Sequence, residues 1–222
     1  MQSTREGIGA GASACTGSPE VSRAVARLRA LHEGYAGVTE VIACGRAAIP
    51  LLEAILFAPD PSGLFEVRVR AAAALAGLGA FDVLVAFLKA RHRLMDPVAQ
   101  AGEEAVVGAA ARHLIGTKSD EVFTVLNRLA LERPIIGVIE ALSSFENPEA
   151  APALAKALRE DDCQRAASEG LLRLGARARP AIETFIAEIG DPGPVDHRAF
   201  ERAVALLRRL PAGDRRAPAD AR

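Results

Sequence analysis

A short motif, L-x-x-L-G, returns along the chain about every 33 residues, and this repeat constrains the fold more than any other feature. Complete copies end at Gly79 and Gly175, and degraded copies extend the series to anchor positions 45, 79, 116, 146, 175 and 211. A period of roughly 30 to 45 residues is the length of a two-helix unit, which buries its apolar side only by stacking on a neighbour. The repeat therefore predicts stacked helix pairs and argues against a parallel α/β sheet.

The segments after the anchors read as amphipathic helices. Pro50, Pro152 and Pro180 each have an apolar residue two positions later and another six positions later. Proline is tolerated at a first helical turn, where its missing N–H has no intrahelical partner. Two further segments place apolar residues at i, i+3, i+4 and i+7. Single helices are expected at 21–44 (with a break near Gly34–Gly37), at 46–58 and near 196–210. Helix pairs are expected within 64–90, 98–131, 135–159 and 162–189.

The segment Val67–Gly79, VRVRAAAALAGLG, shows the first helix of one unit most clearly. Its opening Val-Arg alternation could indicate a strand, but alanines follow without a turn residue, so we interpret the whole segment as helix. The alanines allow close approach of a neighbouring helix, and Gly79 is expected to end the helix in the left-handed conformation.

The composition supports helices and excludes several classes of protein. The chain has 46 alanines, the residue of highest helix propensity, and no tryptophan. A net charge of −1 argues against nucleic-acid binding. We attribute the excess of 24 arginines over 3 lysines to a GC-rich genome. Three scattered cysteines form no disulfide or zinc pattern and favour a cytoplasmic location, and no apolar run is long enough for a membrane span.

The form V-R-x-x-A-A-x-A-L-x-x-L-G at Val67–Gly79 resembles the bacterial HEAT-like repeat found in phycobilin-lyase subunits and scaffold proteins. Cys163–Gly175 is a degraded second copy, with Gln164 where the family prefers arginine. The resemblance covers about residues 37–211 and implies an armadillo-like, right-handed α-solenoid of about five helix pairs. It also implies that Arg68 reaches an acidic group of a neighbouring unit, with a solvated surface charge as the alternative.

We find no pattern that predicts catalysis, a cofactor or a metal site. The four histidines are isolated in the sequence, and a metal site of His113 with Glu103 or Glu104 is disfavoured. A single His-Glu pair, His32-Glu33, does not suffice for the di-iron site of the HEAT-repeat deoxyhypusine hydroxylases. HEAT-like enzymes that excise alkylated DNA bases depend on tryptophan and on a basic groove, which this composition lacks. Asp161-Asp162 is expected to cap a helix.

The second helices of the units are expected to line a concave face with small, weakly charged residues. The candidate partner-binding residues of this groove are Val83, Thr124, Asn127, Lys156 and Thr184. Such a groove suits a peptide or helix of another protein better than a polyanion. The alternative is that these small residues only allow helices to pack side by side.

We therefore expect an all-α chain with a flexible tail at 1–20, a HEAT-like α-solenoid at 21–211 and a second flexible tail at 212–222. The expected function is non-catalytic protein–protein interaction, as a scaffold or adaptor. The alternatives are a phycobilin-lyase-like subunit that handles a chromophore and an enzyme that uses polar groups of the groove. Neither the partner nor the oligomeric state follows from the sequence.

Overall fold

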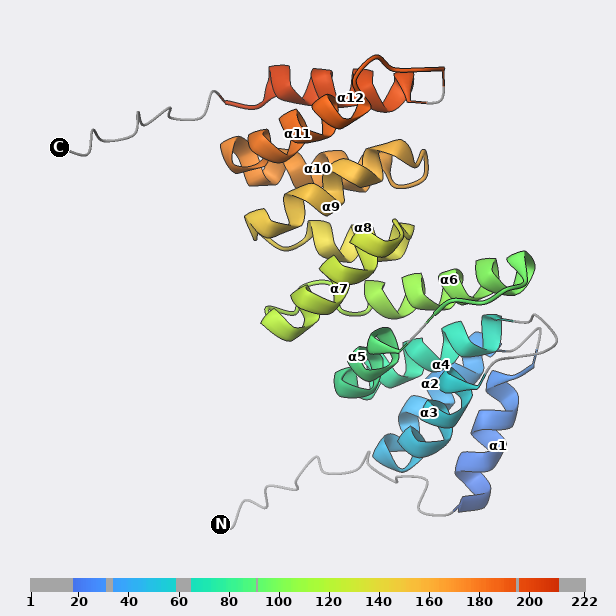
Figure 1. The fold of residues 1–222 in the computed structure, drawn as a ribbon. Coiled ribbons are helices and arrows are strands. Elements are labelled where there is room, and N and C mark those ends of the chain that lie inside the picture. The colour runs from blue at the N-terminus through green and yellow to red at the C-terminus, as the bar shows by residue number, and fades with distance from the viewer. Residues whose placement is uncertain (1–17, 31–33, 59–64, 91, 195, 212–222) are drawn as a thin grey trace, which may run out of the picture. The chain divides into compact units, whose positions relative to one another are not determined.

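The computed structural model describes residues 18–30, 34–58, 65–90, 92–194 and 196–211, and the part it describes is helical throughout, with no strand (Figure 1). This confirms the predicted all-α class. The chain divides into two compact units, residues 1–83 and 84–222. Residues 1–17 of the predicted tail at 1–20, and the predicted tail at 212–222, lie outside the described residues. The first described helix begins at Ser18, so residues 18–20 of the predicted tail are helical.

The first unit consists of short helices. These are α1 (Ser18–Leu28), α2 (Gly34–Ala43), the 3-10 turn Gly45–Ala48, α3 (Ile49–Phe57), α4 (Glu66–Gly77) and the beginning of α5 (Phe81–Lys89). α1 packs on α2, and both α2 and α3 pack on α4. The fully buried side chains of Leu28, Leu52 and Leu75 lie in this core.

The predicted break of the first helix occurs earlier than expected, before Gly34, and Gly34–Ala43 is helical. A Cβ atom on Gly37 would lie 2.5 Å from the backbone nitrogen of Leu28, and one on Gly34 would overlap the Arg70 guanidinium. These two glycines therefore let α2 approach α1 and α4 closely, and they do not interrupt a helix.

Two arginines of α4 are buried, which differs from the solvated alternative considered for Arg68. The Nε of Arg68 donates a hydrogen bond to the carbonyl of Leu56 at 2.8 Å. Arg70 donates to the carbonyls of Leu28 and Ala30 at 3.2 and 2.9 Å. Both side chains therefore satisfy carbonyls at the ends of neighbouring helices, which have no partner inside their own helix.

The second unit continues with longer helices. They are the rest of α5, α6 (Pro97–Arg112), α7 (Asp120–Glu132), α8 (Ile136–Ser143), α9 (Ala151–Lys156), α10 (Gln164–Leu174), α11 (Arg179–Ile189) and α12 (His197–Arg209), with 3-10 turns at Pro148–Ala150, Ala157–Arg159 and Gly175–Ala178. These bounds agree with the predicted helices within a few residues.

Helices of this unit contact their neighbours in a regular order (Figure 1). α8 packs between α6 and α10, and α10 also contacts α12. α9 packs between α7 and α11. Contacts of α7 with α8, α9 with α10, and α11 with α12 join the two series. Each helix therefore buries its apolar side on the helices next to it in this order.

Glycines and prolines lie at helix boundaries where the repeat predicts them. Glycines at four of the six anchors, Gly45, Gly79, Gly116 and Gly175, have positive φ of 61 to 87°. Glycine adopts this conformation without the strain that a Cβ introduces. Pro50, Pro152 and Pro180 each lie in the first turn of a helix, as predicted.

Arginines of the second unit also bind carbonyls at helix C-termini. The pairs are Arg128 with Leu88 and Lys89, Arg173 with Ser143, Arg179 with Leu207, and Arg202 with Leu158. A positive charge at a helix C-terminus is favourable because the exposed carbonyls give that end a partial negative charge. Part of the arginine excess thus has a structural role that composition alone did not indicate.

Asp161 does not cap α10. The residue before α10 is Cys163, which makes no side-chain capping bond. The carboxylate of Asp161 instead accepts from Arg202 and lies 3.6 Å from Arg198 of α12. The hydrogen bond and the charge of Arg202 lower the pKa of Asp161. The prediction of a cap was wrong because these arginines are distant in sequence.

Candidate functional site

α7 brings together two of the predicted groove residues. Thr124 and Asn127 line a pocket of 480 Å³ with Phe123, Arg128, Leu131, Glu132 and Glu149. The Thr124 hydroxyl donates to the carbonyl of Asp120 in the preceding turn, so this bond lies within α7. Oδ1 of Asn127 is buried and has no hydrogen-bond partner among the described residues.

The other predicted groove residues are distributed differently. Lys156 of α9 donates to the carbonyl of Leu131, which places it beside the same pocket. Thr184 of α11 is exposed. Val83 is buried and belongs to the first unit, so it packs in a core and does not present its side chain on an open face.

A second pocket, of 530 Å³, adjoins the first on α7. It shares Arg128 and Glu132 with the pocket of Thr124 and Asn127. Its other lining residues are Lys89, Ala90, His92, Arg93, Gln100, Leu129, Arg133 and Ile135. The two hollows together extend from the α5–α6 connection across α7 to Glu149. We name the 530 Å³ hollow the His92 pocket.

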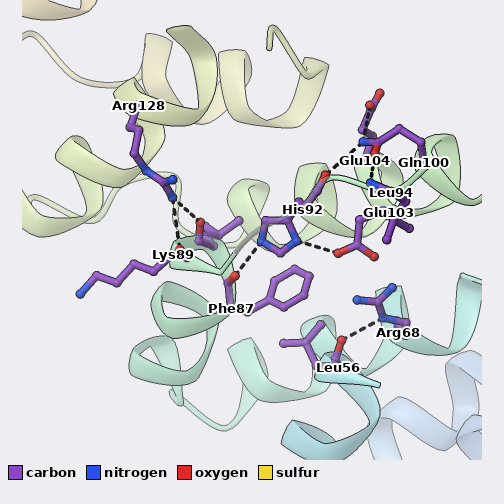
Figure 2. Close-up of polar contacts among 11 residues, drawn as sticks. Leu56, Arg68, Phe87, Lys89, His92, Leu94, Gln100, Glu103, Glu104 and Arg128 are labelled. Carbon is purple, nitrogen blue, oxygen red and sulfur yellow. Dashed lines mark hydrogen bonds and ion pairs between the residues drawn. The ribbon is translucent and has the colours of Figure 1, made fainter. Parts of the chain in front are cut away.

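His92, which lines the His92 pocket, forms a buried pair with Glu103 (Figure 2). The His92 and Glu103 side chains are only 7% and 9% exposed, and Nδ1 of His92 lies 2.6 Å from Oε1 of Glu103. Nε2 of His92 lies 2.7 Å from the carbonyl of Phe87. This carbonyl can only accept, so Nε2 donates to it, and a further proton lies between Nδ1 and the carboxylate. The imidazole also packs against the Phe87 ring.

Gln100 fixes the chain between His92 and α6 (Figure 2). Its Oε1 accepts from the backbone N–H of Leu94 at 2.7 Å, and its Nε2 donates to the carbonyl of His92 and to Glu104. Asp96 caps α6 by accepting from the N–H of Ala99. The connection from His92 to α6 is therefore held by side-chain bonds from both of its ends.

This connection and the first turn of α6 display apolar side chains to solvent. Met95 is 100% exposed, Val98 is 77% exposed and Leu94 is 40% exposed. Most exposed apolar residues occur singly, and a cluster on a fixed segment is the more informative observation. We name Leu94, Met95 and Val98 the apolar loop.

The rim of the His92 pocket is basic. Lys89, Arg93, Arg128 and Arg133 line it, against one carboxylate, Glu132. Lys89 pairs with Glu121, Arg128 with Glu132, and Arg133 with Glu104. Within the described chain, Arg93 has neither a hydrogen bond nor an ion pair. Arg93 is therefore the lining cation whose charge no described carboxylate offsets through an ion pair.

The sequence did not indicate the His92–Glu103 pair, because the two residues are eleven positions apart and belong to different elements. The acids considered with His113 have other partners: Glu103 pairs with His92, and Glu104 with Gln100 and Arg133. Among residues that the structure describes, no three His, Cys, Asp or Glu side chains are placed to hold a metal ion. Outside the pocket, burial is the largest cause that raises the pKa of the Cys163 thiol, to about 11.

No protein-family model matches the chain, and comparison with curated proteins finds no match. None of the described helices combines the length and apolar character that crossing a membrane requires. The HEAT-like resemblance therefore stays a prediction from the sequence motif.

Proposed function

We propose that this chain is a right-handed, HEAT-like α-solenoid that acts as a non-catalytic protein–protein interaction module. Supporting the architecture, helices of residues 97–209 contact their neighbours in regular order, and glycines at the repeat anchors have positive φ. Stacked helix pairs create extended surfaces on which partners bind.

The observation that carries the functional proposal is the presence of two adjoining hollows on α7. The pocket that contains Thr124 and Asn127 adjoins the His92 pocket through Arg128 and Glu132. Neighbouring hollows along one helix offer successive contact positions to a peptide segment or a helix of a partner. The apolar loop adds the exposed hydrophobic side chains that protein interfaces bury.

Lys156 and Thr184 extend the proposed binding face beyond α7. Chromophore handling remains the second hypothesis from the resemblance, and no described contact favours it over protein binding.

Site-specific photocrosslinking in cells tests this function. A photoreactive amino acid at exposed Thr124 is expected to yield a discrete protein adduct, whereas the same residue at exposed Glu169 of α10 is expected to yield none. The variant Thr124→Arg, which fills the hollow without entering the core, should prevent adducts of a reporter placed at Lys156. Equal labelling from Thr124 and Glu169, or no adduct from Thr124, would contradict the proposal.

A further inference from the structure

The geometry points to an acidic segment of the partner protein as the ligand of the His92 pocket, with side-chain carboxylates at its basic rim and apolar residues against the apolar loop. This inference rests on the proposed function and names the chemical class of the partner.

The first argument is local charge. Four cationic side chains line the His92 pocket. Lys89, Arg128 and Arg133 pair with Glu121, Glu132 and Glu104, which leaves Arg93 as the lining cation without a carboxylate partner among the described residues. A concentration of one sign of charge in a concave surface attracts the opposite charge and accelerates association.

The second argument is the supply of free donors. Arg93 makes no ion pair or hydrogen bond within the described residues, so its whole guanidinium is open to a ligand. In the contacts described above, Arg133 uses only its Nε, toward Glu104, and Lys89 bonds only Glu121. Guanidinium groups bind carboxylates through two parallel hydrogen bonds, which gives geometric preference as well as attraction.

The third argument is the fixed position of the site. The His92–Glu103 pair and the bonds of Gln100 hold the connection that carries both Arg93 and the apolar loop. Leu129 and Ile135 contribute apolar surface to the lining of the same pocket. A partner whose acidic residues adjoin apolar residues complements both parts of this surface, and preorganisation lowers the entropy cost of binding it.

Selection from a random peptide library, displayed as fusions with no free C-terminus, tests the inference on the full chain. We expect the enriched peptides to combine glutamate or aspartate with neighbouring apolar residues. A selected peptide should bind Arg93→Glu/Arg133→Glu about tenfold more weakly than the unmodified protein, because both reversals replace attraction with repulsion. Its affinity should also fall as salt is raised from about 0.05 to 0.5 M.

Matched variants separate this inference from the proposed function. Arg165→Glu reverses one charge, as each member of the double variant does, at an exposed site in the first turn of α10, and should leave binding unchanged. Met95→Asp should weaken binding by removing apolar contact. Circular dichroism of each variant checks that the fold is retained.

If no peptide is enriched, or if enriched peptides bind Thr124→Arg and Met95→Asp as well as the unmodified chain, the proposed function fails and this inference fails with it. If the peptides depend on Thr124 or Met95 but carry no acidic excess and bind Arg93→Glu/Arg133→Glu normally, only the acidic partner is refuted. The inference would also be overturned, in favour of a polyanion, if a single-stranded oligonucleotide bound as tightly as the selected peptide and lost affinity in Arg93→Glu/Arg133→Glu.

Discussion

Gly108 of α6 and Gly137 of α8 meet where these two helices pack, and their geometry predicts opposite effects of the same substitution. A Cβ atom on Gly137 would lie 2.1 Å from the carbonyl oxygen of Gly108 and 2.5 Å from its carbon. A Cβ on Gly108 would lie 3.4 Å from a side-chain carbon of Ile135 and 3.5 Å from the nitrogen of Gly137, which is ordinary contact.

The size of each effect follows from these distances. Gly137→Ala forces backbone apart by more than an ångström, since no flexible side chain can yield, and overpacking of this kind costs about 1 to 3 kcal/mol or more. We expect a loss of about 3 kcal/mol in the free energy of unfolding. Gly108→Ala adds a methyl group that fits, and alanine in a helix interior is up to about 1 kcal/mol better than glycine. We expect it to be neutral or slightly stabilising.

Thermal and urea unfolding of the full chain, followed by circular dichroism, measures both effects. For a chain of this length, 1 kcal/mol corresponds to roughly 2–4 °C in Tm, so Gly137→Ala should lower Tm by about 6–12 °C. Gly108→Ala should leave Tm unchanged or raise it slightly. Equal shifts for the two variants, or a Tm for Gly137→Ala within about 2 °C of the unmodified protein, would refute the close approach of α6 and α8.

Three further predictions address other contacts. Arg173→Met removes the hydrogen bonds that Nε and Nη2 donate to the carbonyl of Ser143 and should lower the free energy of unfolding in urea by about 2 kcal/mol. The control Arg165→Met on the same helix should change it by less than about 0.5 kcal/mol. Equal losses for the two variants would show that these bonds contribute nothing. In Gly79→Ala the added Cβ meets no atom within 4 Å, but the residue must keep a φ of +70°. The free energy of unfolding should therefore fall by only about 1–2 kcal/mol. A fall of more than about 3 kcal/mol would mean that packing also requires glycine there. Because burial raises the pKa of Cys163 to about 11, its thiol stays protonated at pH 8 and should resist iodoacetamide until urea unfolds the chain. Peptide mass spectrometry measures this labelling, and native labelling as fast as in urea would contradict it.

The helices themselves could be predicted from the sequence because the forces that form them are local. Apolar spacing, proline in the first turn and glycine at the anchors act within a few residues. The pairs α6–α7 and α10–α11 accordingly begin and end within a few residues of the predicted 98–131 and 162–189. The regular order of neighbour contacts agrees with the repeat, while the handedness and the solenoid remain proposals.

The sites could be predicted only in part. Thr124 and Asn127 line one pocket as expected of a common face, since they lie three residues apart on one helix. The basic rim and the apolar loop were not predicted, because Lys89, Arg93 and Arg133 come from different segments whose proximity depends on how α7 packs beside the α5–α6 connection.

The amino-acid sequence by itself determined most of the helices to within a few residues, because backbone sterics and the 3.6-residue period operate within a turn or two. Only tertiary structure decided which distant groups meet. It turned Gly34 and Gly37 from expected breaks into close-packing positions, buried Arg68 and Arg70 against helix ends, and paired His92 with Glu103. These outcomes depend on helix-to-helix distances, which are set by the combined packing of many side chains and are not encoded at any single position.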